Sequence, residues 1–369
     1  MTWHAEPGEL HLIADRLCER TQPCRHMIES VIEPMFASHT LLDRAIRYVL
    51  LGDAKRVRSS LALIASQAAG GRAEDALEMA VAFELLHTAS LIHDDIMDGA
   101  RLRRGRACVH LVFGTGLAIT AGDALIFEAY RRLLQSLASH PAPAVQRVLS
   151  IFTARAAATC RGQALDLGFA AGSGSVRQYL RMIRAKTGSM IEAPLECAAV
   201  LAGAPGAWCE RFRTYGRCLG VAFQIADDAI DCLGSEAKTG KTLGNDLRNG
   251  RGSALLIYGR ESCSPAEREH VASALRRAQA GADAAPLLAM LYQHGAIVST
   301  QRLAARYAER ARRALQDVGV EPARTQLAAI ASIVGDWKVS SRQPPPFTGE
   351  SHGTRQAVDA DRFVRGHPA

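Results

Sequence analysis

The sequence is poor in aromatic residues and contains no long apolar run. Aromatic residues make up 5% of the 369 residues, although hydrophobic residues together reach 48%, with abundant Ala and Leu. This composition favours helices over a β-sandwich, whose strands depend on aromatic and β-branched side chains. No apolar run extends to about 18 residues without a charge, so we expect no transmembrane segment.

A cysteine framework and a targeting signal are also missing. The nine cysteines form no CxxC pair and have no regular spacing, which excludes a disulfide scaffold and zinc-finger patterns. The chain starts MTWHAEPGEL, without a basic region followed by an apolar one. These features predict reduced, mostly buried thiols in a cytoplasmic protein.

The positive charge is not concentrated anywhere. The formal net charge is +7, but Lys and Arg are scattered, with no basic run and no interleaved aromatic residues. A nucleic-acid surface needs a clustered basic patch, so we expect no nucleic-acid partner. Small anionic molecules are the better inference.

One segment, from Glu84 to Gly105, carries acidic residues at helical spacing and then a pair of arginines. His87, Ser90, Asp94 and Asp98 fall on one stripe of a helix, with Asp95 beside them. Two carboxylates one turn apart suit Mg²⁺, which takes its other ligands from water and phosphates. The guanidinium groups of Arg103 and Arg104 suit phosphate. Alone, this pattern is equally compatible with a solvated helix end.

A second acidic stripe in the other half of the chain favours the metal-binding interpretation. Residues 220–231 read GVAFQIADDAID, which places Asp227 and Asp231 one turn apart, with Asp228 adjacent and Gln224 one turn earlier. Carboxylates that follow apolar, buried runs repel one another and are costly to desolvate. Cations shared between the two stripes would remove that cost.

The paired aspartate motifs resemble those of the trans-prenyltransferase, or polyprenyl diphosphate synthase, family over about residues 40–340. The resemblance implies an all-α fold, a single large helical bundle around a central cavity, and a homodimer. It also implies a head-to-tail condensation of an allylic diphosphate with isopentenyl diphosphate. The cofactor implied is Mg²⁺, with the metal ligands Asp94, Asp95, Asp98, Asp227, Asp228 and Asp231.

The same resemblance assigns residues to the two diphosphates. For isopentenyl diphosphate these are Lys55, Arg58, His87 and Arg104; for the allylic diphosphate they are Arg103, Lys186, Thr187, Gln224, Lys241 and Arg251. The residues that would stabilise the departing diphosphate are Asp94, Asp98, Asp227, Arg103, Lys186 and Lys241. Gln163 and Asp166 match a further family signature and are expected to line the groove. His93 is expected to pack on another side of its helix, away from the chemistry.

The sequence departs from the family pattern at a few positions. Asp53, Ala54 and Ser59 stand where the family has Gly, Gly and Pro. Leu255 follows Arg251, Ser253 and Ala254 where the family has Lys-x-Thr-Leu-Pro, so the Pro is missing. The departures at Asp53, Ala54 and Ser59 leave a class I terpene cyclase of the same fold as an alternative. A non-catalytic subunit that regulates a partner synthase is a second alternative.

Product length depends, by the same resemblance, on the residues before the first aspartate. Ser90 and Ala89 are small where bulky aromatics would stop chain growth, and Phe83 is a candidate floor. We therefore expect geranylgeranyl diphosphate as the product, with a longer polyprenyl diphosphate as the alternative.

The chain is expected to form one helical domain over residues 1–339. Pro23 and Pro34 are expected to break the first helices. The stretch from 340 to 369 is rich in Pro, Gly and polar residues, which is typical of a disordered tail.

Overall fold

The computed structural model describes residues 9–52, 54–169, 174–233, 252–280, 282 and 284–337. Their secondary structure consists of helices and one two-stranded hairpin, in agreement with the predicted all-α class. The elements are α1 (Glu9–Ile32), α2 (Leu41–Leu50), α3 (Val57–Ala68), η1 (Glu74–Ala76), α4 (Leu77–Met97), β1 (Leu102–Arg103), β2 (Arg106–Ala107), α5 (Val109–Phe113), α6 (Thr115–Leu137), α7 (Ala142–Leu167), α8 (Val176–Ile183), η2 (Arg184–Gly188), α9 (Ser189–Leu201), α10 (Gly206–Leu233), α13 (Ala254–Glu261), α14 (Pro265–Gln279), α15 (Ala285–Gln293), α16 (Ala296–Ala314) and α17 (Ala323–Gly335). The predicted tail, 340–369, lies outside the described residues. None of the helices described has the length and apolar character needed to cross a membrane.

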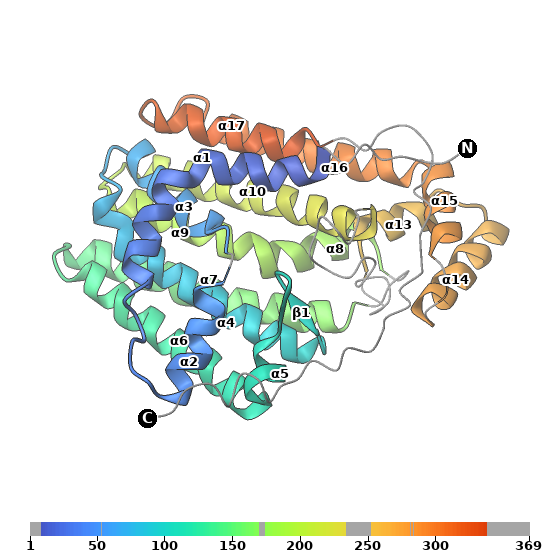
Figure 1. Cartoon of the computed structure of the whole chain (residues 1–369). Helices are drawn as coiled ribbons and strands as arrows, with labels where there is room; N and C mark the ends of the chain where they lie inside the picture. The colour runs from blue at the N-terminus through green and yellow to red at the C-terminus, as the bar shows by residue number, and fades with distance from the viewer. Residues whose placement is uncertain are drawn as a thin grey trace.

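Long helices pack side by side around a buried central helix (Figure 1). α4 packs along α6, α10 packs between α9 and α16, and α7 and α3 both contact α9. α9 is buried on all faces, since every residue from Ser189 to Val200 is buried. A helix that is buried all round belongs in the interior of a bundle, so α9 is the centre on which the outer helices rest.

Two apolar cores of unequal size hold the helices together. The larger one contains residues of α1–α10, α16 and α17. The smaller one is built from α13, α14, α15 and the start of α16, together with Cys232 of α10. In Figure 1 the helices of the smaller core form the group at one end of the bundle, beside the end of α10.

The expected helix break at Pro23 is wrong. α1 continues through Pro23 and ends at Ile32, just before Pro34. The cost of an interior proline is about 3 kcal/mol. On both sides of Pro23, Leu17, Cys24, Ile28 and Ile32 are buried in the main core, and this apolar stripe keeps the helix continuous.

Glycines permit an unusually close approach of helices around η2, which is a single π-helical turn. A Cβ atom added to Gly162 of α7 would lie 2.2 Å from the backbone nitrogen of Lys186. A Cβ atom on Gly220 of α10 would lie 2.9 Å from the Cα atom of Gly188. The π turn is therefore clamped between α7 and α10, and only residues without a side chain fit at these two contacts.

We predict that Gly162→Ala destabilises the protein by about 1–3 kcal/mol, because the new methyl group meets backbone that cannot rotate away. The measurement is the thermal unfolding midpoint followed by circular dichroism. The matched control is Gly168→Ala at the end of the same helix, where an added Cβ atom is 3.8 Å from its nearest neighbours and φ is −91°. Equal midpoints for the two variants would contradict the clamp.

Candidate active site

The first aspartate motif, Asp94, Asp95 and Asp98, lies at the carboxyl end of α4, as the sequence predicts. Asp94 and Asp95 belong to the last turn, and Asp98 caps the helix, its amide donating to the carbonyl of Asp94 at 2.9 Å. Asp95 is only 4% exposed, whereas Asp94 and Asp98 are half-buried. The three carboxylates therefore experience different surroundings although they share one helix end.

A small hairpin follows α4 and carries the two arginines of the first motif segment. β1 and β2 pair through Leu102 with Ala107 and Arg103 with Arg106, and Arg104 and Gly105 form the turn with φ of 54° and 73°. This turn directs Arg103 back to Asp95, and its Nε donates to both oxygens at 2.7 and 2.8 Å. Arg103 thus neutralises Asp95.

Lys186 in the π turn faces the first aspartate motif. Its Nζ donates to Oδ2 of Asp166 at 2.6 Å and lies 3.8 Å from Oδ2 of Asp94. Asp166 comes from the end of α7, so the signature that the sequence flagged there holds the lysine in place. Gln163, one turn earlier, is 9% exposed, and within the described chain neither its Oε1 nor its Nε2 has a hydrogen-bond partner.

The next residue, Thr187, reaches the second aspartate motif, Asp227, Asp228 and Asp231, on α10. Its hydroxyl donates to Oε1 of Gln224 at 2.6 Å, and Nε2 of Gln224 donates to Oδ1 of Asp228 at 2.6 Å. The hydroxyl of Tyr179 donates to the other oxygen of Asp228. Burial raises the pKa of Asp228 to about 7; the two hydrogen bonds oppose this shift, and the charges of Asp227 and Asp166 add to it.

Lys186 and Thr187 are consecutive, so one dipeptide lies beside Asp94 of the first motif and reaches Asp228 of the second motif through Gln224. Consecutive Cα atoms are about 3.8 Å apart, which limits the distance between the groups that these side chains contact. The structure thus brings together Asp94, Lys186, Thr187, Gln224 and Asp228, which the sequence places in three separate segments. The π turn that presents the dipeptide had no signal in the sequence, and Tyr179 had none either.

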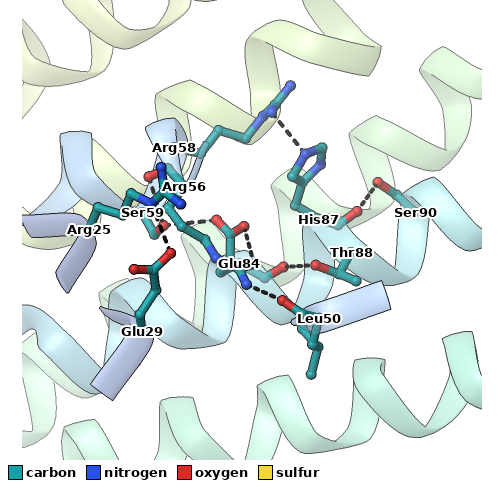
Figure 2. A network of polar contacts seen from close by, with 10 residues as sticks. All are labelled: Arg25, Glu29, Leu50, Arg56, Arg58, Ser59, Glu84, His87, Thr88 and Ser90. Carbon is teal, nitrogen blue, oxygen red and sulfur yellow. Dashed lines mark hydrogen bonds and ion pairs between the residues drawn. The ribbon is translucent and has the colours of Figure 1, made fainter. Parts of the chain in front are cut away.

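A separate pair of bases, Arg58 of α3 and His87 of α4, lies between these two helices (Figure 2). Nη1 of Arg58 is 2.9 Å from Nε2 of His87, which is 8% exposed. Burial and the charges of Arg58, Arg104, Arg103 and Arg56 hold the pKa of His87 well below its usual range. His87 is therefore neutral, and its Nε2 accepts a hydrogen bond from Arg58.

The start of α3 is fixed by a buried network that sequence reasoning did not identify (Figure 2). Arg56 has a left-handed backbone with φ of 50°, and its Nη1 donates to Oε1 of Glu84 at 2.9 Å. The hydroxyl of Ser59 donates to Oε2 of the same carboxylate at 2.8 Å. Arg56 and Glu84 are 4% and 2% exposed, so the ion pair is buried, and both carboxylate oxygens of Glu84 accept a hydrogen bond. Ser59, one of the departures from the family pattern, therefore helps to fix the first turn of α3, which carries Arg58.

The remaining predicted residues are placed as follows. Lys55 is half-buried just before α3, and Arg104 is exposed at the hairpin turn. Asp53, Lys241 and Arg251 lie outside the described residues. Ala54 is buried at 1% exposure, and Leu255, where the family has Pro, is buried in α13. Ser253 caps α13 by accepting from the amide of Leu256 at 3.4 Å, so the helix begins without the missing Pro.

The spacing of the carboxylates suits Mg²⁺, which needs few protein ligands. It does not suit an ion that is surrounded by protein ligands alone. Among the described residues, no three of these carboxylates have ligand oxygens within 4.8 Å of one another. Mg²⁺ usually takes only one or two carboxylates and completes its octahedron with water and substrate phosphates. Asp94 and Asp98 on one side and Asp227 on the other could hold such ions.

Below the first aspartate motif, α4 carries small residues and then an aromatic cluster. Ala89 is buried and Ser90 half-buried. The ring of Phe83 lies 5.0 Å from that of Phe152, which lies 5.1 Å from that of Tyr130.

His93 faces α6, where its Nε2 is 3.7 Å from Asp123, in agreement with the predicted packing role. A small, mostly apolar pocket adjoins Arg58 between α1, α3, α9, α10 and α17.

Comparison with known proteins identifies relatives along most of the chain. The polyprenyl synthetase family model matches residues 39–291. A short chain isoprenyl diphosphate synthase of Methanothermobacter thermautotrophicus is 34% identical over 296 residues, which is 80% of this chain and 90% of the relative. An octaprenyl diphosphate synthase of Escherichia coli is 28% identical over 305 residues, covering 82% of this chain and 92% of that protein.

Solved structures agree with these matches. The geranylgeranyl pyrophosphate synthetase of Pyrococcus horikoshii superimposes with a TM-score of 0.80 at 29% identity, covering 88% of this chain and 99% of that one. The geranylgeranyl pyrophosphate synthase of Corynebacterium glutamicum, complexed with isoprenyl diphosphate and magnesium, has a TM-score of 0.73 at 26% identity and covers 89% and 100% of the two chains. The extent of the family match and the identity to its members show that the chain belongs to the polyprenyl synthetase family of trans-prenyltransferases.

Proposed function

We propose that this enzyme condenses an allylic diphosphate with isopentenyl diphosphate, with Mg²⁺ bound at the two aspartate motifs, and that it makes geranylgeranyl diphosphate. The observation that carries the proposal is that one dipeptide links both motifs: Lys186 lies 3.8 Å from Asp94, and Thr187 reaches Asp228 through Gln224. A leaving diphosphate held between α4 and α10 would meet a fixed cation and hydrogen-bonding groups there.

The enzyme must supply positive charge next to the departing diphosphate. Cleaving an allylic carbon–oxygen bond places negative charge on the diphosphate, and cations fixed beforehand stabilise it without reorganising. Lys186 is held by Asp166, so it is already oriented. Mg²⁺, when bound, would add Lewis-acid stabilisation of the same oxygens. The magnesium complex of the Corynebacterium relative supports this choice of ion. Direct contact of Arg103, Lys241 and Arg251 with the diphosphate stays a prediction.

The second diphosphate would be held by Lys55, Arg58 and Arg104, with His87 positioning Arg58. The neutral His87 accepts from Arg58, and the buried pair of Arg56 and Glu84 fixes the helix start from below. Holding isopentenyl diphosphate in one orientation places its double bond next to the developing cation. This preserved basic group favours a synthase over the class I terpene cyclase, which has no need of a second diphosphate site.

Product length is assigned from α4. Phe83 lies 11 residues before Asp94, so its Cα atom is about 16 Å further along the helix and on nearly the same stripe. The small residues Ala89 and Ser90 leave the intervening part of the helix without an aromatic barrier. This spacing supports a geranylgeranyl chain, and the octaprenyl diphosphate synthase relative supports the longer-chain alternative.

We also infer a cytoplasmic homodimer. The cysteines are thiols, which suits a reducing compartment. On α6, Ile119, Phe127 and Leu134 are 45%, 73% and 55% exposed and project from one side of the helix. A second copy covering this face would bury the exposed ring of Phe127.

The assay that tests the proposal combines purified enzyme, Mg²⁺ and each allylic diphosphate, with and without labelled isopentenyl diphosphate. We expect elongation that requires both substrates. Asp94→Asn should lower kcat by at least ~10²-fold, because it removes a carboxylate that stabilises the leaving group only through its ion. Asp75→Asn, an exposed position at η1, is the control and should retain activity. Cyclic hydrocarbon from an allylic diphosphate alone would favour the cyclase instead.

Chromatography of dephosphorylated products should give geranylgeraniol as the terminal alcohol. Ala89→Phe should shorten the product, because the ring would block the path along α4, whereas Ser90→Ala should leave the length unchanged. Farnesol as the terminal product of the unaltered enzyme would refute the assignment, and octaprenol would support the alternative.

Analytical ultracentrifugation should give twice the mass of one chain, and Phe127→Asp should shift the equilibrium towards the monomer by placing a charge in the interface. Val298→Asp, at an exposed apolar residue of α16, is the matched control and should remain dimeric. A monomer for the unaltered protein, or identical behaviour of both variants, would contradict the assignment of α6.

A further inference from the structure

Cys263, Glu267 and His294 lie together where α13, α14 and α15 meet, and none of them belongs to either aspartate motif. One sulfur, one carboxylate oxygen and one ring nitrogen lie within 4.8 Å of one another. Nε2 of His294 is 3.8 Å from Oε1 of Glu267. Cys263 is buried, and the other two residues are half-buried.

The backbone of each residue is held by its own element. Cys263 lies in the turn between α13 and α14, and its amide donates to the carbonyl of Arg260 at 3.3 Å. Glu267 closes a capping box at the start of α14: its Oε2 accepts from the amide of Ser264 at 2.8 Å. His294 caps α15, and its amide donates to the carbonyl of Met290 at 3.0 Å.

The capping box decides how Glu267 is used. One carboxylate oxygen is occupied by the helix start, so the side chain is oriented, and the other oxygen, Oε1, is the one next to His294. The ring of His294 is therefore directed towards an oriented carboxylate. Cys263 completes a triangle of three different donor types.

We propose that Cys263, Glu267 and His294 form a binding site for Zn²⁺ or a similar transition-metal ion. Thiolate, imidazole and carboxylate are the three ligand types that zinc takes in proteins, at about 2.0–2.3 Å. In a tetrahedral site these bond lengths place neighbouring donors roughly 3.5 Å apart. Small side-chain rotations that shift each donor atom by about 1 Å would therefore bring the three donors to bonding positions. Mg²⁺ prefers an all-oxygen octahedron, so the site should not compete for the proposed catalytic ion.

The site would link the helices of the smaller core. Leu255 of α13, Val271 of α14 and Leu291 of α15 belong to that core, which is much smaller than the main one. α13 and α15 are already in close contact, because a Cβ atom on Gly259 would lie 2.1 Å from Cδ2 of Leu291. A small core gains most from a cross-link that binds only the folded chain. The half-buried side of the triangle leaves a fourth position for water.

The test uses Co²⁺ as a spectroscopic probe on the full chain, freed of metal by a chelator and kept in excess Mg²⁺. Binding at the proposed site should give cobalt–thiolate charge-transfer absorption and the visible bands of a tetrahedral ion, saturating at one equivalent. Zn²⁺ should displace Co²⁺ and abolish the spectrum. Zn²⁺ should also raise the thermal unfolding midpoint by about 2 °C or more.

Cys263→Ser should abolish the thiolate absorption, and His294→Gln should weaken binding at least ~10-fold. Cys160→Ser, at the exposed cysteine of α7, is the matched control and should keep the full spectrum. The far-UV circular dichroism of each variant shows that it is folded. Absence of the thiolate band, or its persistence in Cys263→Ser, would overturn the proposal. Prenyl transfer is assayed separately with Mg²⁺, so failure of this site leaves the proposed function intact.

Discussion

The candidate active site gathers carboxylates near the ends of α4, α7 and α10. Each carboxylate that is removed from water must be stabilised by a cation, a hydrogen bond or a proton. Asp95 receives the guanidinium of Arg103, Asp166 receives Lys186, and Asp228 receives Gln224 and Tyr179. The short hairpin and the π turn are both explained by this requirement, because each one delivers a partner to a carboxylate.

The same rule operates inside the bundle, away from the site. α9 is the most buried helix, and it contains two glutamates, Glu192 and Glu196. Burial raises the pKa of both, while arginines on neighbouring helices oppose the shift. Arg155 lies 2.8 Å from Glu192, and Arg147 lies 3.5 Å from Glu196. These pairs hold α7 against α9, which also carries η2 at its amino end.

The all-α fold could be predicted because composition and the helical spacing of residues are local properties of the sequence. The aspartate motifs were visible for the same reason: their spacing of one turn is written in consecutive residues. Tyr179, Glu84 and Gly162 were not identifiable, because each acts on a residue distant in sequence. Pro23 misled the prediction, because the penalty for an interior proline is local whereas the packing of α1 is tertiary. The metal triangle of Cys263, Glu267 and His294 lacked the short cysteine spacing by which zinc sites are usually found.

Lys186 and Thr187 tie the two sides of the candidate site together. Lys186 lies beside the first aspartate motif, and the adjacent residue Thr187 begins the chain of hydrogen bonds that leads through Gln224 to Asp228. Asp166, which holds Lys186, also raises the pKa of Asp228 on α10 through its charge, so the anchor of the lysine and the second motif are coupled electrostatically across the candidate site.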